Sequence, residues 1–206
     1  QKNAVALARQ FESAGVQMLT VHGRTREQGY SGNAEYDTVA AVKAAVRIPV
    51  VANGDINSPE KARDVLAYTQ ADAVMIGRAA QGRPWIFRDV VHFLATGQHL
   101  APPLVTQVRN SLLAHLLDHY ALYGDLTGLR SARKHIGWYV NGLPGGPAFR
   151  KTMNSLNDVH QQFKAVADFF EALAAHHDRL PVLAMASAVN GGLAQHAVPD
   201  QEQSLA

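Results

Sequence analysis

Two short turns in the sequence combine glycine with polar side chains that could bind an anion. Each follows an apolar run: Asn53-Gly54-Asp55 after the first and Gly77-Arg78 after the second. Glycine lets backbone N–H groups approach a ligand closely, and the guanidinium of Arg78 adds a permanent positive charge. The pair of turns predicts a phosphate-binding cradle. Within it, Asp55 either binds a hydroxyl group of the ligand or, as the more conservative interpretation, holds its own loop in place.

His22 ends another apolar run and is followed directly by Gly23. An imidazole at this position can exchange hydrogen bonds with a planar heterocycle that the glycine allows to approach, and the alternative is a histidine that caps its own turn. The segment that follows, 24–37, is longer than an ordinary strand-to-helix loop. It predicts one wall of an active site, with a variable surface loop as the alternative.

Further basic residues could also bind anions. Arg83 stands just before an expected helix N-terminus, where free N–H groups favour anions, or it is a solvated arginine. A later helix carries a basic face that could neutralise the phosphates of a nucleic acid, although charged helix faces are usually only solvated. That face comprises Arg130, Arg133 and Lys134, with Arg150 and Lys151 nearby.

The histidines of the C-terminal half are expected to be surface or core residues and not metal ligands. His115 and His119 have the i, i+4 spacing of one helix face, and His135 lies further along the chain. No carboxylate partner or open-site signature accompanies them, so no metal site is predicted.

An alternation of strand and helix patterns in the first hundred residues positions these groups. Apolar runs predict strands at 18–22, 49–52 and 73–76, and helical periodicity predicts helices at 3–14, 37–46, 59–68 and 85–95. Ser58 is the expected N-cap of the third helix, with Pro59 at its first position. Crossover helices make the strands parallel, and uniformly apolar runs indicate strands covered on both faces.

Three parallel strands leave two open edges and cannot be a finished sheet. The economical completion is a TIM (β/α)8 barrel, whose phosphate sites often use the loops after the seventh and eighth strands, so these would be its last three βα units. A doubly wound sheet is the alternative, weakened because neither turn shows the G-x-G-x-x-G pattern. The chain starts with Gln1 inside a helical pattern, so we expect that it continues a longer protein.

From Pro102 onward the pattern is helical. Helices are expected at 105–123, 128–140 and 158–176, with a break at 141–147. The predicted organisation is therefore an α/β barrel portion at 1–100, followed by a small all-α domain at 101–178. The remaining segment, 179–206, is rich in small residues and predicts a mostly disordered tail.

Composition excludes several classes of function. The 206 residues are 47% hydrophobic and 17% charged, and the formal charge of +2 means that nucleic-acid binding would rest on local clusters. The absence of cysteine excludes disulfides and thiol chemistry within the chain. No run approaches the roughly 20 apolar residues of a membrane span, so we expect no membrane partner and a cytoplasmic location.

Four segments, in order, resemble the bacterial tRNA-dihydrouridine synthases, most of all the B type. They are HGRTREQGYSGNAEYD, IPVVANGDI, ADAVMIGRAAQGRPWIF and ARKHIGWY, and the similarity extends from near Gln1 to about Ala174. The resemblance implies an FMN enzyme with an α/β barrel and a C-terminal helical domain that helps to hold tRNA. It also implies reduction of the C5–C6 double bond of particular uridines, with NADPH reducing the flavin first. No obligate protein partner is evident.

The same resemblance implies roles for individual residues. His22 would touch the flavin, and FMN would be held, largely through its phosphate, by Asn53, Gly54, Asp55, Gly77 and Arg78. The implied tRNA contacts are Arg24, Arg83, Arg133 and Lys134. The family's proton-donating cysteine and its flavin-facing lysine belong to earlier parts of the barrel, and neither lies in this chain. We therefore expect the chain alone to be inactive and poorly folded.

Two other functions remain open. One is a phosphate-binding barrel enzyme without flavin, such as an isomerase or lyase of a sugar phosphate. The other is a non-catalytic RNA-binding module made of the helical domain and a barrel remnant. Bound flavin would exclude the first, and flavin-dependent reduction of uridine would exclude the second.

Overall fold

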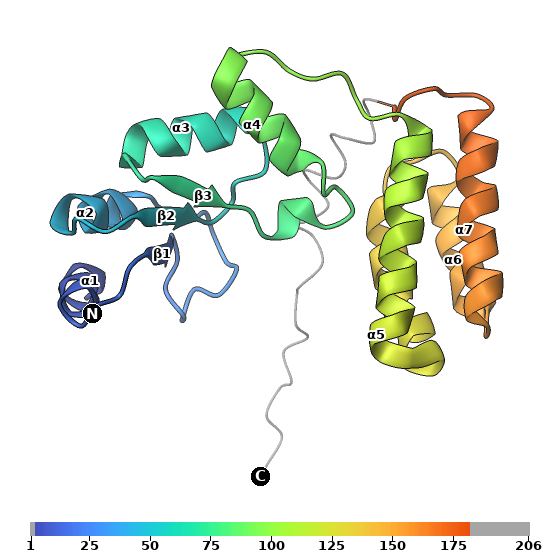
Figure 1. Ribbon diagram of the computed structural model, residues 1–206, viewed down its shortest axis with the longest axis horizontal. Helices are drawn as coiled ribbons and strands as arrows, with labels where there is room; N and C mark the ends of the chain where they lie inside the picture. The colour runs from blue at the N-terminus through green and yellow to red at the C-terminus, as the bar shows by residue number, and fades with distance from the viewer. Residues whose placement is uncertain (1–2, 182–206) are drawn as a thin grey trace, which may run out of the picture. The chain divides into compact units, whose positions relative to one another are not determined.

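The computed structural model describes residues 3–181 of the chain (Figure 1). The chain divides into two compact units between Pro103 and Leu104. Most of the segment predicted to be a tail, 179–206, lies outside the described residues. None of the helices in the described part combines the length and the apolar character needed to cross a membrane.

The first unit alternates helices and strands around a parallel sheet. In chain order its elements are α1 (Ala4–Ser13), β1 (Leu19–His22), α2 (Asp37–Ala45), β2 (Val50–Asn53), α3 (Pro59–Thr69), β3 (Ala73–Met75), the short 3-10 helix η1 (Arg78–Ala80) and α4 (Ile86–Thr96). The strands lie in the order β1-β2-β3, with Leu19 opposite Val50 and Val51 opposite Ala73. The predicted α/β class is confirmed.

Local signals set the boundaries of α3, as predicted. The hydroxyl of Ser58 accepts a hydrogen bond from the backbone N–H of Lys61 at 3.1 Å, and Pro59 occupies the first helical position. At its other end α3 stops at Gln70, whose backbone is left-handed with φ of 55°. Helix α4 stops in the same way at Gly97.

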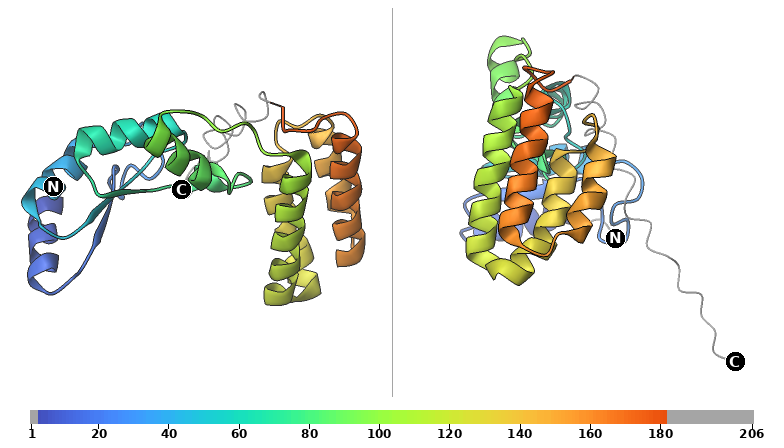
Figure 2. Two further views of the ribbon diagram at one scale, coloured as in Figure 1. Left: turned by 45° about the horizontal axis from the view of Figure 1, so that its top comes forward. Right: turned by 90° about the vertical axis from the view of Figure 1, so that its right-hand side faces the viewer.

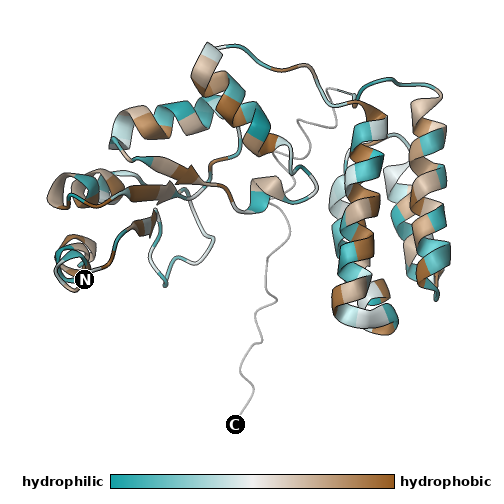
Figure 3. Ribbon diagram, in the orientation of Figure 1, coloured by the Kyte–Doolittle hydropathy of each residue, from teal (hydrophilic) through white to brown (hydrophobic). Residues whose placement is uncertain are grey.

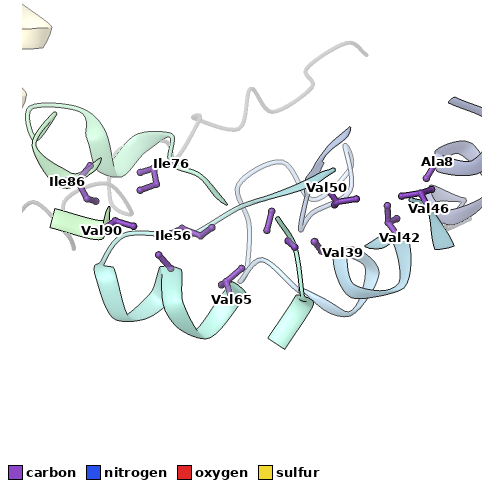
Figure 4. Close-up of a cluster of buried hydrophobic side chains, with 13 residues drawn as sticks. Ala8, Val39, Val42, Val46, Val50, Ile56, Val65, Ile76, Ile86 and Val90 are labelled. Carbon is purple, nitrogen blue, oxygen red and sulfur yellow. The ribbon is translucent and has the colours of Figure 1, made fainter. Parts of the chain in front are cut away.

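The two faces of the sheet differ in burial. Val50 and Ala52 of β2 belong to a core that includes side chains from α1 to α4 (Figure 4). Because side chains alternate along a strand, Thr20, Val51 and Ala73 point to the other face, where Thr20 and Ala73 are exposed although the strands are hydrophobic along most of their length (Figure 3). In this three-stranded sheet β1 and β3 are therefore covered on one face only, and the prediction of cover on both faces is met only by β2.

In its described part, the second unit is built from α5 (Val105–Tyr139), α6 (Gly146–Ser155) and α7 (Val159–Ala174). Helix α5 is interrupted at Gly124, whose φ of 71° and ψ of 169° are not helical. Two helical stretches meet there, in agreement with the break predicted between residues 123 and 128. Helices α6 and α7 pack against α5 and lie beside it (Figures 1 and 2).

A buried polar side chain, Gln162, links α7 to both stretches of α5. Its carbonyl oxygen accepts from the Tyr120 hydroxyl at 2.7 Å, and its amide nitrogen donates to the Leu129 carbonyl oxygen at 3.3 Å. Tyr120 precedes the interruption and Leu129 follows it. The two stretches are therefore held at a fixed spacing by a side chain from a third helix.

Candidate functional site

His22, Asn53 and Met75 stand at corresponding positions on the three strands. The register pairs His22 with Asn53 and Asn53 with Met75, and the side-chain amide of Asn53 donates to the Met75 carbonyl oxygen at 2.8 Å. These residues lie two positions after Thr20 and Val51, so they share the face opposite the core. His22 is exposed and Asn53 is half-buried. The sheet thus presents an imidazole and an amide on neighbouring strands.

The turns after β1 and β2 are packed too closely for larger residues. A Cβ at Gly23 would collide with the carbonyl oxygen of Glu35, and one at Gly54 would lie 2.8 Å from the Cβ of Ala34. Gly54 also has a φ of 122°, which favours glycine. The N–H of Glu35 donates to the Gly23 carbonyl at 2.8 Å, and the Tyr36 hydroxyl donates to the Gly54 carbonyl at 2.7 Å. The loop between β1 and α2 is therefore fixed against both turns.

The carboxylate of Asp55 joins three parts of the site. It accepts hydrogen bonds from the backbone N–H of Ala34 at 2.8 Å, from Arg24 at 2.6 Å and from Arg78 at 3.1 Å. These groups come from the long loop, from its start after β1 and from the turn after β3. The contacts correspond to the second predicted role of Asp55, which is to hold the loop.

The surroundings keep Asp55 ionised. Burial by itself would raise the pKa of this carboxyl group, but hydrogen bonds from Ala34 and Arg24, with the charges of Arg24 and Arg78, hold it below its ordinary value of 3.8. Burial and the negative charge of Asp55 raise the pKa of Tyr36 to about 12. Asp55 is therefore a fixed anion at neutral pH and not a proton-transfer group.

Arg24 is buried, in contrast to the role implied by the resemblance. Only 1% of its side chain is exposed. Besides Asp55, its guanidinium donates to the carbonyl oxygens of Ser31 at 3.3 Å and Gly32 at 2.6 Å. Its Nη1 is buried and has no hydrogen-bond acceptor among the described residues. Arg24 positions the loop, and in this arrangement its guanidinium cannot reach the phosphates of a large polyanion.

Arg83 is also buried, with 7% of its side chain exposed. Its guanidinium lies 3.9 Å from the carboxylate of Asp89 and donates to the carbonyl oxygen of Asn57 at 3.4 Å. Burial lowers the pKa of the guanidinium, while the charge of Asp89 acts in the opposite direction. Three expectations were open for Arg83: an anion site at a helix N-terminus, a solvated arginine and a tRNA contact. All three need an accessible side chain. None of them fits a residue that ties the turn before α4 to the start of α3.

Arg78 is a cation at the strand ends that a ligand can reach. Its side chain is 28% exposed and is held between Asp55 and the ring of Tyr30, whose centroid lies 4.6 Å from the guanidinium carbon. At Gly77, an added Cβ would have no described atom within 4 Å, so packing within the chain does not require glycine there. A cation beside an uncrowded turn, at the same edge of the sheet as His22, can hold an anionic group that is attached to a planar ring.

The two basic residues predicted on the second unit differ in accessibility. Arg133 is half-buried and donates from Nη2 to the carbonyl oxygen of Leu156 at 2.9 Å, which fixes the end of α6. Lys134 is exposed, and its ammonium lies 5.1 Å from the centroid of the Trp138 ring. Lys134 therefore offers the more accessible charge.

Several residues of the strand-end site were not singled out from the sequence. Tyr30 stacks on Arg78, the N–H of Ala34 binds Asp55, and Tyr36 donates to the turn after β2. The only signal for them was the length of the loop in which they lie, which predicted a wall of the site without indicating which side chains form it.

Comparison with known proteins gives a consistent family assignment. A family model described as dihydrouridine synthase (Dus) matches residues 1–175. Among curated relatives, the chain is 55% identical over 169 residues to the tRNA-dihydrouridine synthase B of Pseudomonas putida, which covers 82% of this chain and 50% of that protein. It is 53% identical over 174 residues to the protein of the same name from Xanthomonas axonopodis pv. citri, covering 84% of this chain and 52% of the relative.

A third relative extends the pattern to another genus. The tRNA-dihydrouridine synthase B of Shewanella oneidensis is 53% identical over 172 residues, which are 84% of this chain and 53% of that protein. The chain therefore spans about half the length of the curated relatives that it matches.

Proposed function

The chain belongs to the dihydrouridine synthase family, among its bacterial B-type members, and we propose that it is part of an enzyme that reduces uridines in tRNA. The reaction would saturate the C5–C6 double bond of the uracil ring, with FMN as the bound cofactor and NADPH as the reductant. The observation that carries this proposal is the position of Arg78. Asp55 holds this cation beside the row that contains His22 and Asn53.

In this proposal the strand ends bind both the phosphate and the ring system of FMN. The phosphate would be bound at Gly77 and Arg78, where an accessible guanidinium adjoins a turn with space around it. The ring system would be contacted by His22, with Asn53 beside it. Asp55 would contribute indirectly, because its carboxylate orients the guanidinium of Arg78. Bound FMN would supply hydride transfer to the uracil ring.

We further propose that the sheet forms the last three βα units of a TIM barrel. The parallel strand order supports this. So does the position of His22 and Asn53 at the carboxyl ends of their strands, where barrel enzymes have their active sites. Thr20, Ala73 and Met75 are exposed on the face opposite the helices, which is the face that would line the barrel interior. Neighbouring strands would pair with β1 and β3.

The second unit is proposed to hold tRNA, with residues 101–178 as the helical domain. Lys134 is the residue of choice for a phosphate contact, because it is exposed and supported by Trp138. Arg133 would contribute through the part of its guanidinium that Leu156 does not engage. Arg24 and Arg83 are not retained as direct contacts, because both are buried.

In this proposal the chain supplies binding and orientation, and not the proton. The family's proton-donating cysteine has no counterpart among these 206 residues, which contain no cysteine. At the candidate site the carboxylate of Asp55 stays ionised and is engaged by Ala34, Arg24 and Arg78. We therefore still expect that the chain alone does not catalyse the reduction of uridine.

The test uses a purified full-length protein that contains this chain, in wild-type form and as Arg78→Ala. Losing one charge-assisted contact of roughly 1.5–3 kcal/mol should weaken FMN binding by about 10- to 100-fold. The matched control is Arg47→Ala, since Arg47 is exposed and precedes β2, at the end of the strand opposite the site. Flavin absorbance measures the cofactor, and dihydrouridine formed in tRNA with NADPH measures the reaction.

The results separate the three functions. Bound FMN, uridine reduction and selective loss of FMN in Arg78→Ala would support the proposal. Wild-type protein without flavin would favour a sugar-phosphate isomerase or lyase. Salt-dependent tRNA binding without reduction would favour a non-catalytic RNA-binding module. Retention of FMN by Arg78→Ala would show that the phosphate site lies elsewhere.

A further inference from the structure

Three histidines of the second unit, which the sequence separates by up to 20 residues, meet in one cluster. One ring nitrogen from each of His115, His119 and His135 lies within 4.8 Å of the other two. The ring centroids are 4.9 Å apart for His115 and His135, 5.0 Å for His119 and His135, and 6.1 Å for His115 and His119. The sequence showed only the spacing of the first two.

The interruption of α5 brings the third histidine to the others. His115 and His119 are one turn apart on the first helical stretch, so they share a face. At Gly124 the chain leaves the helical conformation, and the second stretch then packs against the first. The approach is tight at Gly128, where a Cβ would lie 3.1 Å from the ring of Tyr120. His135 therefore belongs to the opposing helical stretch.

The surroundings shield the three rings from solvent and orient one of them. His119 is 8% exposed, and His115 and His135 are half-buried. Nε2 of His119 lies 2.7 Å from the hydroxyl of Ser131, which fixes the orientation of that ring. Imidazole nitrogen is a common zinc ligand in proteins.

We propose that His115, His119 and His135 bind one divalent transition-metal ion of the zinc type, with three imidazole ligands and a fourth position open to water. Three nitrogens favour zinc, nickel or copper over magnesium and calcium, which prefer oxygen ligands. Tetrahedral zinc needs nitrogens about 3.4 Å apart, so ring nitrogens up to 4.8 Å apart must approach by up to about 1.4 Å, which side-chain rotations can provide. The ion would brace the two stretches of α5. This inference does not depend on the proposed reaction.

The alternative is that the three histidines bind no metal and only pack against neighbouring aromatic rings. Tyr123 lies 4.6 Å from the ring of His119, and Trp138 lies 5.1 Å from that of His135. Such a stack would gain nothing from a metal ion. Metal affinity and its dependence on each histidine therefore distinguish the two interpretations.

In the experiment, Zn²⁺ is titrated into metal-stripped, purified protein that contains the whole chain, and calorimetry measures its binding. The titration is repeated with Co²⁺, whose visible absorption reports tetrahedral coordination. We expect one ion per chain at micromolar or tighter affinity. His115→Asn and His135→Asn should each weaken binding at least about tenfold. His160→Asn is the matched control, because His160 is exposed at the start of α7 and lies outside the cluster.

A thermal melt with and without Zn²⁺ gives an independent readout. The ion should raise the melting temperature of the wild-type protein and of His160→Asn, and it should not raise that of His135→Asn. His119 is left unchanged because its burial couples it to folding, and circular dichroism confirms that the other variants are folded. The proposal is overturned if the wild-type protein shows no saturable binding, or if His115→Asn and His135→Asn bind the ion as tightly as the wild-type protein does.

Discussion

Replacing Asp55 by asparagine keeps the shape of the side chain but removes the negative charge that Arg24 and Arg78 share. The guanidinium of Arg24 would then remain in the interior, with 1% of its side chain exposed, beside a neutral amide. The N–H of Ala34 could still donate a hydrogen bond to the side-chain oxygen of the asparagine. The substitution therefore isolates the charge from most of the geometry.

The expected loss of stability follows from the exposure of the two cations. The charge-assisted hydrogen bond to the buried Arg24 is worth roughly 1.5–3 kcal/mol. The pair with Arg78 is partly exposed, with 28% of the arginine side chain in solvent, so screening limits its loss to about 0.5–1 kcal/mol. We expect the free energy of unfolding to fall by about 3 kcal/mol, the lower end of the range for breaking a buried ion pair.

Urea denaturation followed by far-ultraviolet circular dichroism measures this change in a purified protein that contains the chain. With a urea dependence of about 2 kcal/mol per molar, the midpoint should fall by about 1.5 M. The matched control is Asp64→Asn, which removes a carboxylate that is 60% exposed and paired with Arg63, and which should change stability by less than about 0.5 kcal/mol. If Asp55→Asn unfolds at the same urea concentration as Asp64→Asn, the argument that Asp55 holds the site together is wrong.

The pH dependence of the same difference is a second check. Because the folded state lowers the pKa of Asp55, the stabilisation is fully present above the unfolded value and is lost as pH falls through the folded value. The gap between wild type and Asp55→Asn should therefore be constant near neutrality. It should narrow below about pH 4.

Three further predictions concern the turns, the basic face and a helix cap. Gly54→Ala should lower the unfolding free energy by roughly 1–3 kcal/mol, since φ is 122° and the new Cβ meets a neighbour at 2.8 Å. At Gly77 the new Cβ meets no described atom, so Gly77→Ala should cost less stability and weaken flavin binding. Urea midpoints measure the stability of both variants, and flavin titration measures the binding. Lys134→Ala should weaken tRNA binding and reduce its salt slope by about 0.9, whereas Lys164→Ala should not, as salt-dependent titrations would show. Ser58→Ala should cost about 1 kcal/mol in the same urea assay.

Short-range signals predicted most of the secondary structure. Ser58 and Pro59 marked the start of α3 because both act on backbone groups within one turn. The end of each apolar run likewise placed His22 and Asn53 at the same edge of a parallel sheet, where the register pairs them. These features depend on residues that are close in the sequence.

The burial of charged side chains could not be predicted from the sequence, because it depends on partners that are distant along the chain. Arg24 finds its carboxylate 31 residues away, and Arg83 is covered by the packing of α3 and α4. The type of residue predicts a charge but not whether solvent reaches it. In the same way, the pattern of α5 indicated two helices, but only the backbone at Gly124 determines that His135 faces His115.

The fastening of the loop between β1 and α2 has a consequence for how a ligand would be captured. Arg24 ties the carbonyl groups of Ser31 and Gly32 to Asp55, and Tyr36 ties the far end of the loop to Gly54. The chain's own contacts therefore fix this loop, so binding of a ligand would require little further ordering of it. A site built in this way would select a ligand by its fit, without a closing movement of this segment.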